Sequence, residues 1–303
     1  MMTTYYDEMS RILKLEKTMG NIKKRQHYVP RTYLKPFSSS GKNKDMIWAY
    51  FHDQKRKRFV AIDDVCVENY LYEHYICYGD GATEFISPNS IENRYMQLEN
   101  TYRPIIEKII GNKNDIISFI EEDRDNLIGF MATLLFRHPL FINMSNTLGE
   151  RFYNECSEWR KEISKAFPDV DDVYFKMFYL HGMLEKQQDP DQSLIIQAMK
   201  GTLDDDQLCV FKSCSGEFVT SDAPVVNIYG DIDGLEYDLV GMPISPEYFV
   251  AFIDIDKNVS NKVFVIDNEQ IMSLNKHQQE HSTGGILMSK SEVALNRILF
   301  NAY

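Results

Sequence analysis

Hydrophobic spacing divides the chain into three stretches. Residues 47–51 and 58–62 are rich in aromatic and β-branched residues and flank the basic turn 55–57, which predicts two strands. Residues 69–72 indicate a third short extended piece. From about residue 89 to 200, apolar residues recur at helical spacing, and from residue 207 the strand pattern returns.

The central stretch predicts a block of helices. The first begins after Asn89, with Glu92 at the third position as in a capping box, and carries a buried stripe that includes Leu98. Ser118 and Glu121 suggest a second capping box, for a helix that ends near Arg137 because Pro139 follows. Three more helices are predicted over residues 143–166, 173–184 and 192–200.

The last stretch predicts a sheet followed by helices. Strands are expected at residues 207–212, 216–220, 225–228, 248–253 and 262–265, and helices from Asp267 or Asn268 to His277 and over 291–299. An isolated hairpin is marginal in water, so we expect residues 47–62 to pair with this sheet. The order predicts an α+β fold with a mixed or antiparallel sheet from N- and C-terminal strands around a central helical block.

The domain organisation follows from the same pattern. Residues 1–22 are expected to be a leader, in helical form if ordered, because apolar residues there have roughly helical spacing. Residues 23–303 are expected to form a single domain, with the helical block at about 89–200, because no linker or internal repeat interrupts them.

Charge and cysteine content narrow the function classes. The 303 residues carry a formal net charge of −12, which argues against nonspecific coating of nucleic acid but not against a local basic groove. The 5 cysteines are scattered without a Cys-x-x-Cys pair, which favours buried reduced thiols over a zinc site or disulfide framework. The sequence shows no signal peptide and no run approaching about 18 apolar residues, so a cytoplasmic protein without membrane contact is expected.

Residues 23–37, with the sequence KKRQHYVPRTYLKPF, concentrate basic, aromatic and proline residues around His27. The run His27 to Pro30 and the aromatic residues after it resemble the opening of the bacterial family DUF4238. Further short stretches match the same family in order: residues 136–139 (FRHP), 220–224 (TSDAP) and 243–246 (PISP). Ala223 replaces the asparagine that the family usually has there. The resemblance spans nearly the whole chain, and the family brings no established activity.

These motifs supply three candidate catalytic residues, His27, Arg137 and Asp222, which we expect to line one pocket. A histidine transfers protons near neutral pH, an arginine binds a phosphate or carboxylate, and a carboxylate orients a histidine or acts as a base. Each has a structural alternative: His27 pins a loop, Arg137 complements a helix C-terminus, and Asp222 caps backbone amides in a turn. Two neighbours are given lesser roles: His138 is expected to be structural or exposed, and Ser221 lacks the Gly-x-Ser-x-Gly setting of a nucleophile.

The residues around His27 are candidates for substrate binding: Arg25, Gln26, Tyr28, Arg31 and Tyr33. Tyr28, Tyr33 and Phe37 are of the type that stacks on bases, while neighbouring cations hold phosphates. The sequence therefore allows a nucleic acid or nucleotide as partner at a local basic site.

No metal or cofactor site is indicated with any strength. Glu92 and Glu99, seven residues apart, flank the apolar stripe of the first helix, and the alternative to a metal site is a cap for Glu92 and a pair with Arg103 for Glu99. The acidic run 204–206 is expected to be a solvated turn. No P-loop, Gly-x-Gly-x-x-Gly, His-Glu-x-x-His or EF-hand pattern is present.

Two interpretations of function remain. The first is a hydrolase of a phosphate-containing substrate, a nuclease or nucleotide hydrolase with a role in phage defence. The second is a non-catalytic module that binds nucleic acid, nucleotide or protein. Side chains of His27 and Asp222 within about 4 Å of each other in an open cleft favour the enzyme, and separated or fully buried side chains favour the module.

Overall fold

The described chain contains two five-stranded sheets, and the strands of one of them all come from the C-terminal half. The structure is a computed structural model that describes residues 22–41, 44–79, 81–189, 191–214, 216–232, 235–255, 258–282 and 285–300; the leader predicted over residues 1–22 lies almost wholly outside them. This first sheet, the C-terminal sheet, has the strand order β10-β11-β12-β8-β13. Its strands are antiparallel except that β13 runs parallel to β8. Its strands are β8 (Gln207–Ser213), β10 (Val226–Ile232), β11 (Leu235–Pro243), β12 (Tyr248–Asp254) and β13 (Val263–Ile266).

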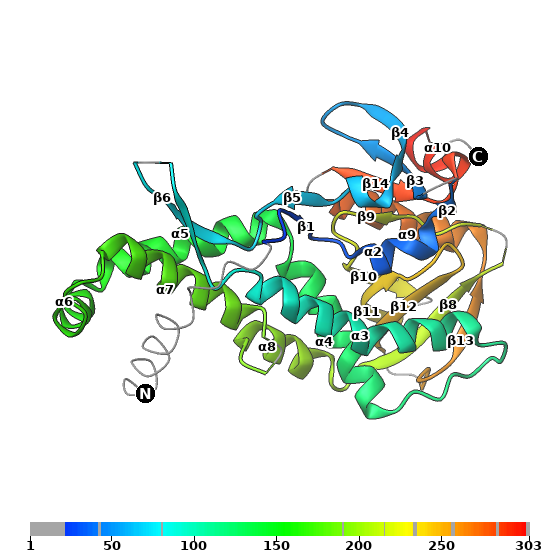
Figure 1. The fold of residues 1–303 in the computed structure, drawn as a ribbon. Helices are drawn as coiled ribbons and strands as arrows, with labels where there is room; N and C mark the ends of the chain where they lie inside the picture. The colour runs from blue at the N-terminus through cyan, green and yellow to red at the C-terminus, as the bar shows by residue number, and fades with distance from the viewer. Residues whose placement is uncertain are drawn as a thin grey trace.

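Both faces of this sheet are buried, because apolar side chains occupy successive positions along its central strands. Leu208 and Val210 of β8 face the main core cluster, which also takes in side chains of helices α3 (Ser90–Gly111) and α4 (Glu121–Phe136). Cys209 of β8 faces a second core cluster with Ile271 of helix α9 (Asn268–His281). Figure 1 shows α3 and α4 along one side of the strands.

The predicted N-terminal strands do join C-terminal strands, as expected, but in a second sheet instead of in the first. It has the order β2-β3-β14-β9, with β4 on β3, and its strands are β2 (Ser39–Ser40), β3 (Asp45–Phe51), β4 (Arg56–Ala61), β9 (Thr220–Ser221) and β14 (Ile286–Ser289). Among the described residues, strands β3 and β4 therefore do not pair directly with residues 207–265: β3 pairs with β14, and β14 in turn pairs with β9. Ile47 and Ala49 nevertheless pack in the same core cluster as Val210 and Val250, so the two sheets share one core.

The helical block contains, after α3 and α4, helices α5 (Pro139–Glu155), α6 (Ser157–Ala166), α7 (Asp172–Gln187) and α8 (Leu194–Leu203). The prediction of a single helix over 143–166 is wrong. The helix is interrupted at Cys156, whose φ of −85° and ψ of 50° are not helical. Its start is earlier too, because Pro139 occupies the first helical position instead of blocking it. Figure 1 shows α5, α6 and α7 extending away from the sheets.

Neither predicted capping box forms. Asn89 has a left-handed backbone and caps no helical amide with its side chain; instead its Oδ1 accepts a hydrogen bond from the backbone N–H of Lys23 at 2.8 Å. The second helix begins at Glu121, three residues after Ser118, and the Asp123 carboxylate accepts from the Ile120 N–H at 3.2 Å.

Short elements complete the fold. Strand β1 (Arg25–His27) pairs with β5 (Val67–Asn69), and β6 (His74–Cys77) pairs with β7 (Thr83–Ile86). Helix α2 (Arg31–Leu34) follows β1 and continues into a 3-10 turn at Lys35–Phe37. A second 3-10 turn, Ile62–Asp64, follows β4, and α10 (Glu292–Phe300) is the last described helix. Among the described residues no single helix has the length and apolar character needed to cross a membrane; α4 and α5, with a 72° bend between them, meet those criteria only as a pair.

The cysteines are free thiols, but not all are buried as expected. Cys66 and Cys209 are buried, whereas Cys77, Cys156 and Cys214 are exposed. Burial raises the pKa of the Cys66 thiol well above its ordinary value, so it stays protonated at neutral pH.

Candidate functional site

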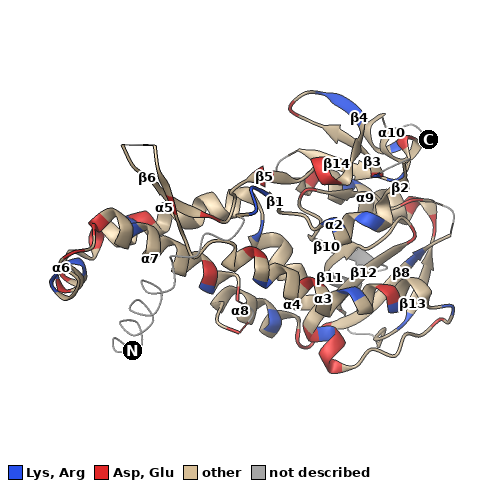
Figure 2. Ribbon diagram, viewed as in Figure 1, with Lys and Arg blue, Asp and Glu red and all other residues tan. Residues whose placement is uncertain are grey.

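A cavity of about 780 Å³ lies against the N-terminal motif. Its walls come from the segment around β1 and α2, the turn Ile62–Asp64, one side of α3 and the C-terminal end of α4. Six cationic side chains line it against four carboxylates, whereas the chain as a whole is strongly acidic. The lining charges are Lys23, Arg25, Arg31, Lys35, Lys44, Arg137, Asp45, Asp63, Glu92 and Glu99. Figure 2 shows blue on β1 and beside α2, two of the elements that supply lining residues of this cavity.

Strand β1 sends alternate side chains to opposite sides, as an extended backbone requires. Arg25 and His27 line the cavity. Gln26 is buried: its Nε2 donates to Glu73 Oε1 at 2.7 Å, and its Oε1 accepts from the Tyr72 N–H at 2.8 Å. Gln26 is therefore unable to contact a ligand in the cavity, and its expected binding role is corrected here.

The His27 imidazole is half-buried at the cavity wall. Its Nε2 lies 3.2 Å from the Asp63 carbonyl oxygen, and a carbonyl only accepts, so Nε2 carries the proton and donates it. Nδ1 makes no hydrogen bond to any residue that the structure describes. Burial, and next the positive charge of Arg31, lower the pKa of His27 below its ordinary value of 6.5. The ring is therefore neutral at pH 7, with the Nδ1 lone pair available as a proton acceptor.

Arg137 lines the cavity but is almost fully buried, and its guanidinium is engaged by protein groups. Nη2 donates to the His27 carbonyl oxygen at 2.7 Å, Nη1 donates to Glu99 Oε1 at 3.1 Å, and Cζ lies 4.0 Å from the centre of the Tyr95 ring. The Tyr72 hydroxyl also donates to the same His27 carbonyl, at 3.1 Å. These contacts hold the backbone of the motif in place and leave Arg137 little capacity to grip a separate anion.

Asp222 is not among the residues that line this cavity. It is fully buried, and neither carboxyl oxygen has a hydrogen-bond partner among the described residues. The turn role expected for it falls instead to Ser221, whose Oγ accepts from the Ala223 N–H at 3.2 Å and donates to Gln278 at 3.0 Å. Ser221 is itself fully buried, which agrees with its dismissal as a nucleophile.

The three sequence motifs do meet in the interior, but Tyr28 and His138 face Asp222 there in place of their neighbours His27 and Arg137. His138 Nε2 lies 3.9 Å from Asp222 Oδ2, and the His138 and Tyr28 rings meet edge-on with centroids 5.3 Å apart. His138 Nδ1 accepts from the Leu140 N–H at 3.2 Å, which places the proton on Nε2, facing the carboxyl group. His27 and Arg137 thus face the cavity, while Tyr28 and His138 face Asp222 in the interior.

His138 is the residue of this cluster that sequence reasoning set aside. Of the two alternatives expected for it, structural or exposed, the structural one holds: His138 is buried and caps the start of α5 through its ring nitrogen. Its position directly before a proline that begins a helix was the available signal, since such a residue adopts an extended backbone and can fold its side chain over the first turn.

The aromatic residues of the motif do not offer stacking surfaces. Tyr28, Tyr33 and Phe37 are all buried. The Tyr33 hydroxyl donates to the Pro243 carbonyl oxygen at 2.5 Å and lies 3.0 Å from Thr220 Oγ1, joining the motif to the second sheet. The expectation that these rings stack on nucleic-acid bases is therefore corrected.

The acidic residues of α3 are used differently from the expected pairing. Glu99 binds Arg137 and accepts from Thr32 Oγ1 at 2.9 Å, while Arg103 pairs with Glu107 at 2.9 Å instead. Burial raises the pKa of Glu92, whose Oε2 has no hydrogen-bond partner among the described residues. Across the described residues, no three or more His, Cys, Asp and Glu side chains are placed to share a metal ion.

Lys35, Lys44 and Asp63 also line the cavity, and sequence reasoning gave none of them a role. Lys35 belongs to the same basic segment and was recognisable from it. Lys44 and Asp63 reach the cavity from a loop and a turn, for which the sequence offers no periodic signal.

The family described as "Protein of unknown function (DUF4238)" matches residues 25–292. No curated protein and no solved structure matched the chain. The match contains the β1 motif, His138 and Asp222, and it extends over nearly the whole chain, so the protein belongs to the DUF4238 family.

Proposed function

We propose that the cavity beside β1 binds a small phosphate-bearing ligand, a nucleotide or the phosphorylated end of a nucleic acid. The observation that carries this proposal is the excess of cations over carboxylates in the lining of a cavity on a chain whose net charge is −12. Local cationic excess attracts phosphate even where the whole molecule repels it.

The cations at the mouth are free to exchange partners. Arg31 pairs with Asp63 at 2.7 Å and Arg25 with Asp64 at 2.8 Å, but half or more of each arginine side chain is exposed. Exposed pairs contribute little, about 0–1 kcal/mol, so a phosphate dianion competes with these carboxylates. Lys35 and Lys44 form no ion pair with the residues that the structure describes. Arginine and lysine together then supply both fork-like and point-charge contacts to phosphate oxygens.

The size of the cavity favours a small ligand. Its volume of about 780 Å³ lies within the range of about 300–1,000 Å³ that is common for small-molecule sites. Without an exposed aromatic ring at the motif, we expect affinity to come from the phosphate more than from the base.

Titration calorimetry with AMP and with adenosine tests this proposal. AMP is expected to bind with a dissociation constant that rises with ionic strength, and adenosine to bind far more weakly, because the phosphate supplies the contacts. Arg31→Ala should weaken AMP binding at least about tenfold, since a charge-assisted hydrogen bond contributes about 1.5–3 kcal/mol.

Arg103→Ala is the matched control. Arg103 is 64% exposed and ion-paired, much as Arg31 is 60% exposed and ion-paired, but it does not line the cavity. Equal binding of AMP and adenosine, or equal losses in the two arginine variants, contradicts the proposal.

Hydrolysis of the bound phosphate is a second candidate, favoured by the free Nδ1 of His27. In that reaction Nδ1 takes a proton from water as the water oxygen bonds to phosphorus; the bond from phosphorus to the leaving oxygen breaks, and that oxygen is protonated by solvent. Asp222 is fully buried and does not line the cavity, so it does not assist His27 there. Because the Asp222 side chain is fully buried, the criterion of fully buried side chains favours binding without catalysis as the first candidate.

Bis(p-nitrophenyl) phosphate is a suitable probe for hydrolysis. An activity that disappears in His27→Asn and falls on acidification below the ordinary histidine range supports a catalytic base, because the pKa of His27 is lowered. Undiminished activity in His27→Asn excludes that role. A cytoplasmic location and a part in phage defence belong to the same proposal.

A further inference from the structure

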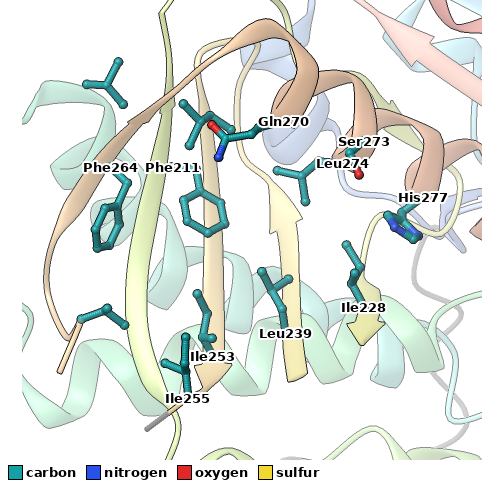
Figure 3. A pocket seen from close by; sticks show the side chains of 13 residues that line it. Phe211, Ile228, Leu239, Ile253, Ile255, Phe264, Gln270, Ser273, Leu274 and His277 are labelled. Carbon is teal, nitrogen blue, oxygen red and sulfur yellow. The ribbon is translucent and has the colours of Figure 1, made fainter. Parts of the chain in front are cut away.

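A second cavity, of about 500 Å³, lies on the other side of the C-terminal sheet. Strands β8, β10, β11, β12 and β13 supply one wall, and helix α9 supplies the opposite edge (Figure 3). The apolar side chains on this face continue past the part of the sheet that α9 covers. Phe211, Phe264, Ile255 and Leu274 are only partly buried at the edge of the core cluster and surround the cavity.

The lining has a consistent chemistry. Among the residues that the structure describes, neither lysine, arginine, aspartate nor glutamate lines the cavity. Its polar side chains are Gln270, Ser273 and His277, all of which come from α9. Positions three, four and seven apart share one helix face, so these polar groups form a single edge along an otherwise apolar space. Figure 3 shows them on the helix above the strand side chains.

We propose that this cavity binds an uncharged, predominantly apolar small molecule with a hydrogen-bonding group on one side. A volume of about 500 Å³, apolar walls and a few polar groups on one edge are the usual features of a small-molecule site. The described lining contains no carboxylate, lysine or arginine, which disfavours a charged ligand, because a charge placed against these side chains loses hydration without gaining a partner.

A concave space between a sheet and a helix also favours a small molecule over a second folded protein. A stable protein interface buries about 800 Å² on each partner, generally over a broad surface. Here the apolar lining is recessed beneath α9 at one end. This proposal is independent of the phosphate site, since the two cavities share no lining residue in the described part of the chain.

N-phenyl-1-naphthylamine tests the proposal, since it is neutral and apolar, has one N–H group and becomes fluorescent in apolar surroundings. We expect saturable binding with one site per chain. Ser273→Phe should weaken that binding at least tenfold by filling the mouth from an exposed position, with little effect on thermal stability. Lys276→Phe is the control: it adds the same side chain to an exposed position of the same helix that does not line the cavity, and it should leave the affinity unchanged.

Four outcomes overturn the proposal: no saturable binding, equal losses in both variants, tighter binding of the anionic analogue 8-anilinonaphthalene-1-sulfonate, or a dimer that Ser273→Phe dissociates. The last of these, measured by light scattering, would assign the apolar lining to a second copy of the chain. AMP binding in Ser273→Phe should equal that of the unmodified protein, so the two proposed sites can fail separately.

Discussion

Arg137 holds His27 by its backbone: Nη2 donates to the His27 carbonyl oxygen at 2.7 Å, while the imidazole of His27 lines the cavity. Arg137 therefore fixes the position of the His27 backbone and leaves the imidazole ring free of this contact. The sequence suggested these two residues as catalytic partners, whereas in the structure Arg137 supports the backbone of His27.

Arg137→Ala should destabilise the fold by about 3–5 kcal/mol, because it removes a buried ion-pair partner from Glu99 and a donor from the His27 carbonyl. Arg137→Lys should recover only part of this, since one ammonium group cannot reproduce the planar contacts to His27, Glu99 and the Tyr95 ring. Urea denaturation measures the loss. The exposed Arg103→Ala variant should change stability by no more than about 1 kcal/mol, and a similarly small change in Arg137→Ala would show that the buried network is not needed for folding.

His27→Ala should cost only about 1 kcal/mol, because the ring makes one hydrogen bond, to the Asp63 carbonyl. If hydrolysis is the function, the same variant should lose it completely. Thermal denaturation and the phosphodiester assay are run on one preparation. A severe loss of stability with ligand binding intact once folded would identify the histidine as a structural pin.

Asp222→Asn should increase stability by about 1–3 kcal/mol, because an amide costs less to bury than a carboxylate, and the oxygens of Asp222 have no hydrogen-bond partner among the described residues. A double-mutant cycle with His138→Gln measures the coupling across the 3.9 Å separation, which is too long for a direct hydrogen bond. Asp125→Asn, at an exposed position, is the control for the substitution itself. A destabilised Asp222→Asn protein with strong coupling to His138 would show that the carboxylate and imidazole stabilise each other.

Asp206→Asn should stabilise the protein at pH 8 but not at pH 4.5. Burial, and next the charge of Asp254, raise the pKa of Asp206 to about 6 from an ordinary value of 3.8. The folded chain thus binds this proton more tightly than the unfolded chain, so its contribution to stability is complete below about pH 3.8 and is lost as pH rises through about 6. The difference in melting temperature between variant and parent should grow across that window, whereas Asp169→Asn, at an exposed position, should show no such trend.

Much of the fold was predictable where periodicity is long. The first helix buries Ile91, Tyr102 and Ile109 as its spacing predicted, whereas Leu98, predicted with them, is only partly buried. Glu92 and Glu99 lie at the margin of this stripe. Strands β8 and β12 were recognised from their β-branched and aromatic content. The break at Cys156 escaped because no proline or glycine marks it, and β11 and β14 escaped because the first contains polar and glycine positions and the second is short.

The candidate site was predictable in its segments but not in its orientation. The motifs around residues 27, 137 and 222 do approach one another, yet in the first of them the side chain that turns inward depends on how β1 pairs with β5. A shift of one residue along a strand reverses its faces, and a short motif carries no signal that sets this register.

The alternation along β1 has a consequence for genetics. Substitutions at Gln26 and Tyr28 damage packing and buried hydrogen bonds, so they should behave as temperature-sensitive alleles that are rescued by growth in the cold. Substitutions at Arg25 and His27 change the cavity wall and should be equally defective at every temperature. A saturation library over residues 25–28, selected at two temperatures, would therefore separate into two interleaved phenotypes with a period of two residues.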